Sequence, residues 1–190
     1  MSTIKIKDKT FTVSIPESKI QQEVKRVAEE INRDLKDENP LFLSVLNGSF
    51  MFASDLMRNL TIPCEISFVK LASYQGTSSS GKMKELVGLS EEIKGRTVVI
   101  VEDIVDTGFT MQHLLKTLAE REPKDVRIAT LLVKPDKLQV ELDIQYVAMH
   151  IPNDFIVGYG LDYDGYGRNY RDIYTVVELS LIHISEPTRL

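Results

Sequence analysis

A run of β-branched residues, followed by a short loop and a helix, most constrains how this chain folds. Residues 98–101 read VVIV, which is typical of a strand buried on both faces of a parallel sheet. Residues 111–120, MQHLLKTLAE, are helical by periodicity and propensity. Between them lie Thr107, Gly108 and Thr110. Such a junction presents free backbone N–H groups and the positive end of a helix dipole, so it suits a phosphate.

Strands alternate with helices along the rest of the chain. Apolar runs of strand length predict strands at 10–15, 40–46, 64–74, 126–134, 144–151 and 155–161. Amphipathic patterns predict helices at 16–39 and 49–60, with Pro16 in the first turn of the former. The Gly- and Ser-rich segment 75–85 is expected to be a loop. This alternation predicts an α/β fold with a mainly parallel central sheet flanked by helices.

Composition narrows the class of protein. The 190 residues suit one domain, expected over 1–178. A net charge of −5 argues against a nucleic-acid-binding surface. The single cysteine, Cys64, excludes an intramolecular disulfide and suits a reducing compartment. The chain has neither an apolar run of membrane-spanning length nor an apolar core of a signal peptide near its start. We therefore expect a cytoplasmic protein that binds neither nucleic acid nor membrane.

The last residues, 179–190, differ in character from the rest. They read LSLIHISEPTRL, and SLIHISEPTRL resembles translated sequencing-adapter sequence. We expect part of this tail to be non-native. The alternative is a final strand followed by a frayed end.

Three carboxylates, Glu102, Asp103 and Asp106, adjoin the predicted phosphate site. An anion would be repelled by them, so they need another partner. Carboxylates accept hydrogen bonds from the vicinal hydroxyls of a ribose and bind Mg²⁺, which prefers oxygen ligands. The loop after a parallel strand lies at the carboxyl edge of the sheet, where α/β folds bind ligands. A ligand with a phosphate, a ribose and a metal-bound pyrophosphate would use all of these groups, which predicts phosphoribosyl pyrophosphate with Mg²⁺.

The stretch VVIVEDIVDTGFT, residues 98–110, resembles the phosphoribosyl-pyrophosphate motif of type I phosphoribosyltransferases. Over residues 4–178 the chain is similar to the hypoxanthine-guanine branch of that family. The supporting segments are VLNGSF (45–50), KLASYQGTSSSG (70–81), LLVKP (131–135) and DFIVGYGLDYDGYGRN (154–169). The resemblance implies the type I fold with a small hood region, and a homodimer or homotetramer.

The resemblance assigns the phosphate and ribose contacts to the central motif. Glu102 and Asp103 would hold the ribose hydroxyls and Mg²⁺, and Asp106 would exchange a proton with N7 of a purine. The segment around the 5′-phosphate would be Asp106, Thr107, Gly108, Phe109 and Thr110.

The pyrophosphate contacts come from two other segments. Leu46, Asn47 and Gly48 match a pyrophosphate loop that often contains a non-proline cis peptide, and Arg168 would contact the same group. Many family members carry Lys where this chain has Asn47, so one positive charge is missing here. Ser73 and Tyr74 would open a loop that closes over the site.

The purine contacts come from the last third of the chain. Lys134 would hydrogen-bond the 6-oxo group, Phe155 would stack on the ring, and the Ile156 backbone would read its edge. Asp162 would bind a second Mg²⁺ next to the base, through the coordination shell of that ion.

The resemblance therefore implies a purine salvage enzyme. It would transfer phosphoribosyl from phosphoribosyl pyrophosphate to hypoxanthine or guanine, giving IMP or GMP and pyrophosphate. Two alternatives stay open. One is a phosphoribosyltransferase for xanthine or uracil, although Lys134 and Phe155 favour a 6-oxopurine. The other is a non-enzymatic regulator that senses phosphoribosyl pyrophosphate. Against it stand the retained Asp106, which proton transfer needs, and the lack of an appended nucleic-acid-binding domain.

Overall fold

The computed structural model describes residues 3–73 and 84–177. Within them a six-stranded sheet has the strand order β5-β4-β3-β6-β7-β8. All neighbouring strands in it are parallel except β5, which pairs antiparallel with β4. The strands are β3 (Leu41–Val45), β4 (Glu65–Ser73), β5 (Lys84–Val87), β6 (Thr97–Val105), β7 (Asp125–Val133) and β8 (Tyr146–His150). The prediction of an α/β fold with a mainly parallel sheet is confirmed.

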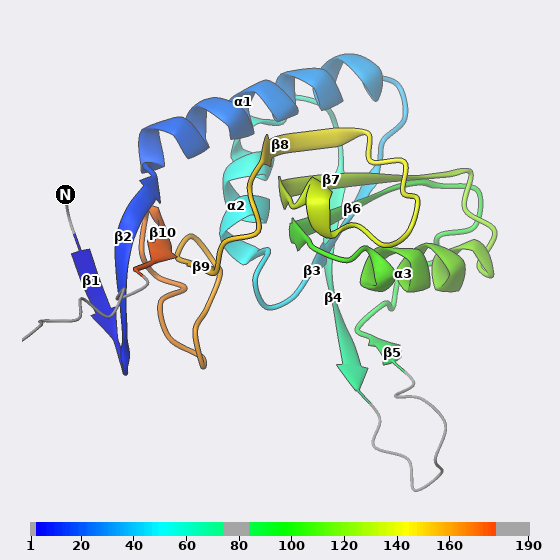
Figure 1. Ribbon diagram of the computed structural model, residues 1–190. Helices are drawn as coiled ribbons and strands as arrows, with labels where there is room; N and C mark the ends of the chain where they lie inside the picture. The colour runs from blue at the N-terminus through cyan, green and yellow to red at the C-terminus, as the bar shows by residue number, and fades with distance from the viewer. Residues whose placement is uncertain (1–2, 74–83, 178–190) are drawn as a thin grey trace, which may run out of the picture.

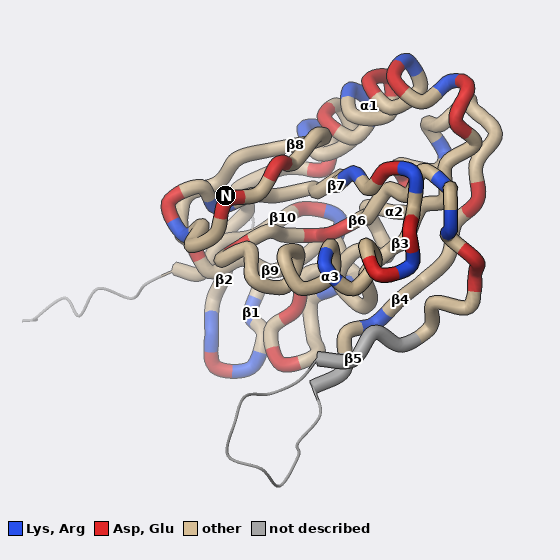
Figure 2. The backbone as a smooth tube through the Cα atoms, turned by 90° about the vertical axis from the view of Figure 1, so that its right-hand side faces the viewer, with Lys and Arg blue, Asp and Glu red and all other residues tan. Residues whose placement is uncertain are grey.

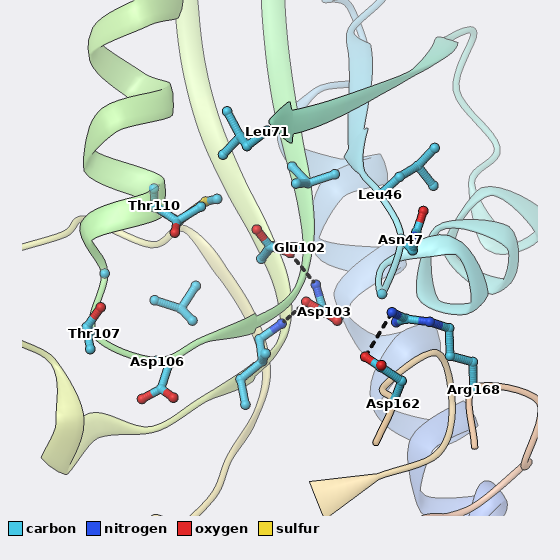
Figure 3. Close-up of a pocket in the computed structure, with 16 residues that line it drawn as sticks. Leu46, Asn47, Leu71, Glu102, Asp103, Asp106, Thr107, Thr110, Asp162 and Arg168 are labelled. Atoms are coloured by element: carbon cyan, nitrogen blue, oxygen red, sulfur yellow. Dashed lines mark hydrogen bonds and ion pairs between the residues drawn. The ribbon is translucent and has the colours of Figure 1, made fainter. Parts of the chain in front are cut away.

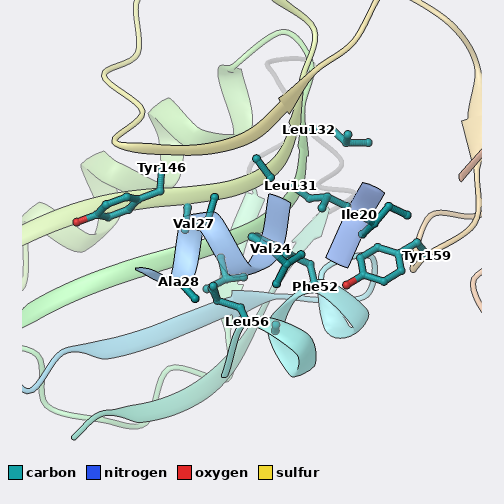
Figure 4. Close-up of a cluster of buried hydrophobic side chains, with 14 of the residues drawn as sticks. Ile20, Val24, Val27, Ala28, Phe52, Leu56, Leu131, Leu132, Tyr146 and Tyr159 are labelled. Carbon is teal, nitrogen blue, oxygen red and sulfur yellow. The ribbon is translucent and has the colours of Figure 1, made fainter. Parts of the chain in front are cut away.

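Helices cover both faces of this sheet (Figure 1). The helices α1 (Glu17–Asp34) and α2 (Phe50–Asn59) pack on one face, and α3 (Phe109–Ala119) packs on the other. The apolar stripe of α1 that the sequence predicts is fully buried against α2 and the sheet (Figure 4). On its outer side α1 alternates charges of both signs (Figure 2), including ion pairs of Arg26 with Glu23 and Glu30. Burial of the stripe fixes α1 and α2 relative to the strands.

A smaller antiparallel sheet forms the predicted hood beside the main sheet (Figure 1). Its strand order is β1-β2-β10-β9. The strands are β1 (Thr3–Ile6), β2 (Lys9–Ile15), β9 (Ile156–Val157) and β10 (Ile173–Val176). Buried Ile6, Phe11, Val157 and Tyr174 form its own small core. The hood thereby anchors both ends of the segment 158–172.

Two predicted elements, one helix and one strand, are shorter in the structure than the sequence pattern predicts. The helix predicted to run to Asn39 ends at Asp34, and Pro16 is its N-cap rather than part of its first turn. The strand predicted over 155–161 stops at Val157. There Gly158, Tyr159 and Gly160 have φ values of 103°, 48° and 97°, which are left-handed conformations that turn the chain.

The strand predicted at 98–101 is longer than expected. It continues as β6 to Val105, so Glu102 and Asp103 belong to the strand rather than to the loop after it. Pairing with β7 continues through Glu102, Ile104 and Val105. The acidic residues still reach the carboxyl end of the sheet, but from a rigid strand.

Other differences lie near the ends of the predicted loop. Lys84 and Glu85, predicted as loop, form the start of β5. Tyr74 and the tail 179–190 lie outside the described residues. A short 3₁₀ helix, η1 (Pro135–Lys137), follows β7. Among the described residues, none of the helices has both the length and the apolarity to cross a membrane.

Candidate functional site

A cavity of about 380 Å³ opens at the carboxyl end of β6 (Figure 3). It is bounded by the end of β6, the turn into α3, the turn between β3 and α2, and the segment after β9. Most residues assigned by sequence lie on its wall. They are Leu46, Asn47, Gly48, Glu102, Asp103, Asp106, Thr107, Gly108, Thr110, Asp162 and Arg168.

Glu102 and Asp103 stand at the centre of this wall (Figure 3). The Glu102 side chain is 7% exposed, and its Oε1 accepts a hydrogen bond from the Asp103 backbone N–H at 3.1 Å. Burial raises the pKa of Asp103 above its usual value, while hydrogen bonding with Glu102 and the charge of Arg168 oppose the shift. Two carboxylates that have lost part of their hydration favour a cation or hydroxyl donors as partners.

The turn from β6 into α3 is shaped for an anion. Gly108 is the N-cap residue of α3 with φ 88°, and an added Cβ would lie 2.6 Å from Val140 Cγ2. No acidic residue lies in the first turn of α3. The Asp106 carboxylate in the preceding turn is paired with Lys137, so the positive end of the dipole can still attract an anion. Thr107 and Thr110 face the same cavity (Figure 3). Phe109, also assigned to this group, does not line the cavity and is exposed.

Asp106 occupies the turn between the strand and the helix. Its Oδ2 lies 3.1 Å from Lys137 Nζ of η1. Its Oδ1 is buried and accepts no hydrogen bond from the described residues. This oxygen is therefore available to a proton donor that enters the site. The sequence analysis missed Lys137, because nothing in its local pattern distinguishes it from a surface lysine.

The turn between β3 and α2 faces the acidic pair. The Leu46–Asn47 peptide bond is cis, as the resemblance implies. A Cβ on Gly48 would lie only 1.6 Å from Asp103 Oδ2, and a Cβ on Gly160 would lie 2.1 Å from the Gly48 carbonyl oxygen. Gly48 is thus enclosed between a carboxylate and a second turn. Glycine is required there for close approach rather than for its φ angle.

Arg168 and Asp162 close the cavity opposite α3 (Figure 3). Arg168 Nη2 lies 2.8 Å from Asp162 Oδ1, and its Nη1 donates to the Gly160 carbonyl oxygen at 2.7 Å. Asp162 Oδ2 accepts a hydrogen bond from the Gly165 N–H. A guanidinium held in this way presents fixed donors to an anion.

Of the residues assigned to the purine, Asp162 lines the cavity, whereas Lys134, Phe155 and Ile156 do not. Lys134 follows β7; its N–H donates to the Val105 carbonyl and its Nζ to the Asp154 carbonyl at 2.7 Å. Burial lowers the pKa of Lys134. The Phe155 ring is 46% exposed and meets the Tyr163 ring edge-on at 5.7 Å, while the Ile156 side chain is buried.

The structure describes only one of the two residues assigned to a closing loop. Ser73 is the last residue of β4. Tyr74 lies outside the described residues. Besides Lys137, sequence reasoning missed Tyr163 and Gly160, although the Gly-Tyr-Gly sequence at 158–160 is a recognisable turn signal.

A family model for the phosphoribosyl transferase domain matches residues 16–164. The chain belongs to the phosphoribosyltransferase family. Among curated relatives, a hypoxanthine-guanine phosphoribosyltransferase of Mycobacterium bovis is 40% identical over 169 residues, covering 85% of this chain and 82% of the relative. One of Streptococcus pyogenes is 41% identical over 158 residues, covering 83% and 86%.

Solved structures of the same family resemble this one. A hypoxanthine-guanine phosphoribosyltransferase from Bacillus anthracis has a TM-score of 0.81 at 36% identity and covers 87% of this chain and 98% of its own. A hypoxanthine phosphoribosyltransferase of Trypanosoma cruzi has a TM-score of 0.81 at 34% identity, covering 92% and 95%. The predicted family, and its hypoxanthine-guanine branch, are confirmed.

The packing around Gly48 yields a first prediction. In Gly48→Ala the new Cβ must displace the Asp103 carboxylate, because the two would otherwise overlap. A displacement of this size beside the reacting groups should lower kcat/KM for phosphoribosyl pyrophosphate, the ligand predicted from the sequence, by about 10²-fold. The control is Gly95→Ala, whose Cβ meets nothing within 4 Å. Because Gly95 has a φ of 70°, this variant should lose some stability, but its kcat/KM should stay close to the wild-type value. Equal kcat/KM values for the two variants would contradict this account of Gly48.

Proposed function

We propose that the protein transfers the 5-phosphoribosyl group from phosphoribosyl pyrophosphate to N9 of hypoxanthine or guanine. The products would be IMP or GMP and pyrophosphate. One observation carries the proposal: a single cavity brings the Glu102–Asp103 pair and Asp106 together with the start of α3 and Arg168. Relatives that bear the name hypoxanthine-guanine phosphoribosyltransferase, at about 40% identity over most of the chain, support it.

Phosphoribosyl pyrophosphate would lie across this cavity. Its 5′-phosphate would be bound by the backbone N–H groups and hydroxyls of residues 106–110 at the start of α3. Its ribose hydroxyls would donate to Glu102 and Asp103. Its pyrophosphate would lie by the 46–48 turn and Arg168, both of which line the cavity.

Mg²⁺ fits this arrangement as a metal that enters with the pyrophosphate. Among the described residues there is no group of three or more His, Cys, Asp or Glu side chains that could hold a metal ion. Mg²⁺ in phosphate-binding sites commonly uses only one or two carboxylates, with water and phosphate oxygens as the remaining ligands. The partly dehydrated Glu102–Asp103 pair, and Asp162 through water, would supply those carboxylates. When bound, Mg²⁺ would neutralise charge on the departing pyrophosphate.

The transfer step needs a nucleophile on the purine. Loss of pyrophosphate leaves positive charge on the ribose ring, which the neighbouring carboxylates would stabilise electrostatically. A neutral purine is a weak nucleophile, and removal of its N7 proton raises the electron density at N9. Asp106 would accept that proton. The support is its place at the turn, with Oδ2 paired to Lys137 and Oδ1 without a hydrogen bond from the described residues.

Base selection would depend on Lys134. Its ammonium group is held 2.7 Å from the Asp154 carbonyl, directly before the exposed Phe155 ring. A lysine can only donate, so it matches the 6-oxo group of hypoxanthine or guanine and opposes the amino group of adenine. Phe155 would stack on the base, and its edge-on contact with Tyr163 supports the orientation of the ring.

Two alternatives use the same cavity. A sensor of phosphoribosyl pyrophosphate would need the phosphate and ribose contacts but not Asp106. A transferase for xanthine or uracil would keep Asp106 and differ at the base. The position of Asp106 and the names of the relatives favour the hypoxanthine-guanine enzyme.

We also propose a cytoplasmic homodimer or homotetramer. The single Cys64 suits a reducing compartment. The exposed rings of Phe50 and Phe68 lie on the α2 face of the sheet, since Phe68 pairs with Ser44, whose hydroxyl contacts Ser49 next to Phe50. Exposed aromatic residues on one face are common at contacts between subunits.

The second prediction concerns Asp106. Asparagine keeps the size of the side chain but cannot accept a proton near neutral pH. In Asp106→Asn, kcat with hypoxanthine should fall by about 10²- to 10⁴-fold. Calorimetric binding of phosphoribosyl pyrophosphate should change little. Asp37→Asn serves as the control, because Asp37 is exposed and precedes β3 at the amino end of that strand. Turnover near the wild-type value in Asp106→Asn would exclude the proposed base, and no turnover of any purine by the wild type would favour the sensor.

The third prediction concerns Lys134. In Lys134→Gln the side chain loses its charge but can donate or accept. Use of hypoxanthine and guanine should weaken, with a relative gain for adenine in kcat/KM. The exposed Lys116→Gln on α3 controls for loss of a positive charge. An unchanged order of the bases would show that Lys134 does not face the 6-position.

The fourth prediction concerns the assembly. A charge on the α2 face should disfavour burial of that face against a second copy. Phe68→Asp should therefore lower the mass measured by sedimentation, and Phe109→Asp, exposed on the opposite face of the sheet, should not. A wild-type monomer, or an unchanged oligomer in Phe68→Asp, would contradict this contact.

A further inference from the structure

We propose that Tyr159 is a positioning residue, whose hydroxyl group, bonded to Asp55, sets the separation between the 46–48 turn and the loop that carries Arg168. These two segments form the walls between which pyrophosphate would lie. The proposal rests on the proposed function, since it concerns the same cavity. It adds a residue that neither lines this cavity nor contacts the reacting atoms.

Tyr159 connects three segments that are distant in sequence. Its ring is 2% exposed, and its hydroxyl donates to Asp55 Oδ2 of α2 at 2.6 Å. The same oxygen accepts a hydrogen bond from Gln21 Nε2 of α1, also at 2.6 Å. In Figure 4 the ring lies at one end of the buried cluster, beside Ile20 and Phe52. Both helices are thereby tied to the turn that follows β9.

The helix α2 carries one wall of the pyrophosphate site. It begins at Phe50, two residues after Gly48. The junction is rigid, because Ser49 Oγ donates to the Val45 carbonyl at 2.6 Å and bonds to Ser44 Oγ at 2.7 Å. A shift of Asp55 relative to Tyr159 is therefore a shift of the 46–48 turn.

The turn at 158–160 carries the opposite wall. Gly160 N–H donates to the Arg168 carbonyl at 2.9 Å, and the Gly160 carbonyl accepts from Arg168 Nη1 at 2.7 Å. Tyr159 N–H donates to the Tyr170 carbonyl. Gly160 itself packs against the Gly48 carbonyl so closely that a Cβ would not fit. The two walls thus meet at Gly48 and Gly160, and the Tyr159–Asp55 bond holds them together from behind.

In the hydrogen bond between Tyr159 and Asp55, the tyrosine hydroxyl remains the donor. Burial and the adjacent Asp55 carboxylate raise the pKa of Tyr159, so its hydroxyl stays protonated and donates. Asp55 also borders a second cavity, of about 550 Å³. Water in that cavity could solvate the carboxylate when the hydroxyl is removed. Tyr159→Phe would therefore break the link without leaving a buried charge unpaired, and should still fold.

The test compares two tyrosines that lose the same hydroxyl. Tyr146 is also 2% exposed, and its hydroxyl bonds to Arg127 Nη1 at 2.9 Å and to Asp34 Oδ2 at 3.3 Å. Figure 4 shows it at the other end of the cluster from Tyr159. Tyr146→Phe thus controls for loss of a buried tyrosine–carboxylate hydrogen bond. Both variants are measured for melting temperature and for calorimetric binding of pyrophosphate with Mg²⁺ and of IMP.

Tyr159→Phe should raise the Kd of pyrophosphate by about 10- to 100-fold, the equivalent of one hydrogen bond to a charged group. The Kd of IMP should stay within about twofold of the wild type, since the 5′-phosphate and base contacts come from other elements. Tyr146→Phe should alter neither Kd. Asp55→Asn keeps an acceptor oxygen and should produce a smaller rise than Tyr159→Phe.

Two results would overturn the proposal. One is an unchanged Kd of pyrophosphate in Tyr159→Phe. The other is an equal loss of affinity for pyrophosphate and IMP, which would indicate a general structural role. If Tyr159→Phe fails to fold, the ratio of the two Kd values is measured in Asp55→Asn instead and decides in the same way. Failure of the proposed function would look different from failure of the Tyr159 proposal. In that case the wild type would bind these ligands but turn over no purine.

Discussion

The close approach of three backbone segments around Gly48 is the constraint on which the cavity depends. Gly48 is enclosed between the Asp103 carboxylate and the Gly160 turn, so strand β6, the β3–α2 turn and the segment after β9 meet at one point. β6 is fixed in the sheet between β3 and β7, and α2 is fixed by its burial under α1. The acidic residues therefore have little freedom to move, which favours binding of a ligand at low reorganisation cost.

Much of this arrangement could be predicted from sequence, because the signals are local. The VVIV run and the helix after it placed Glu102, Asp103 and the 106–110 turn at the carboxyl edge of the sheet. The stripe from Ile20 to Leu35 placed α1 on the core. The full extent of β6 does not follow from sequence, because charged residues at the end of an apolar run are typical of loops, although the sheet pairing here continues through them.

Contacts between distant segments could not be predicted in the same way. Lys137 is paired with Asp106 across 31 positions of sequence, and Tyr159 with Asp55 across 104. Nothing in the local sequence around either residue indicates its distant partner. The apolar pattern likewise predicts that the strand continues through 158–160, where the structure has a left-handed turn, because such a pattern carries no information on φ. Such residues determine how the walls of the cavity are spaced, whereas the motif determines which groups stand on them.

The central claim is that the Glu102–Asp103 pair binds the ribose and Mg²⁺ of phosphoribosyl pyrophosphate. The most direct measurement is calorimetric titration of this ligand, with Mg²⁺, into the variant Glu102→Gln/Asp103→Asn, in which both side chains keep their shape and lose their charge. Loss of two charge-assisted interactions predicts a Kd raised by about 10²-fold or more, with the melting temperature of the free protein preserved. A Kd equal to that of the wild type would contradict the claim.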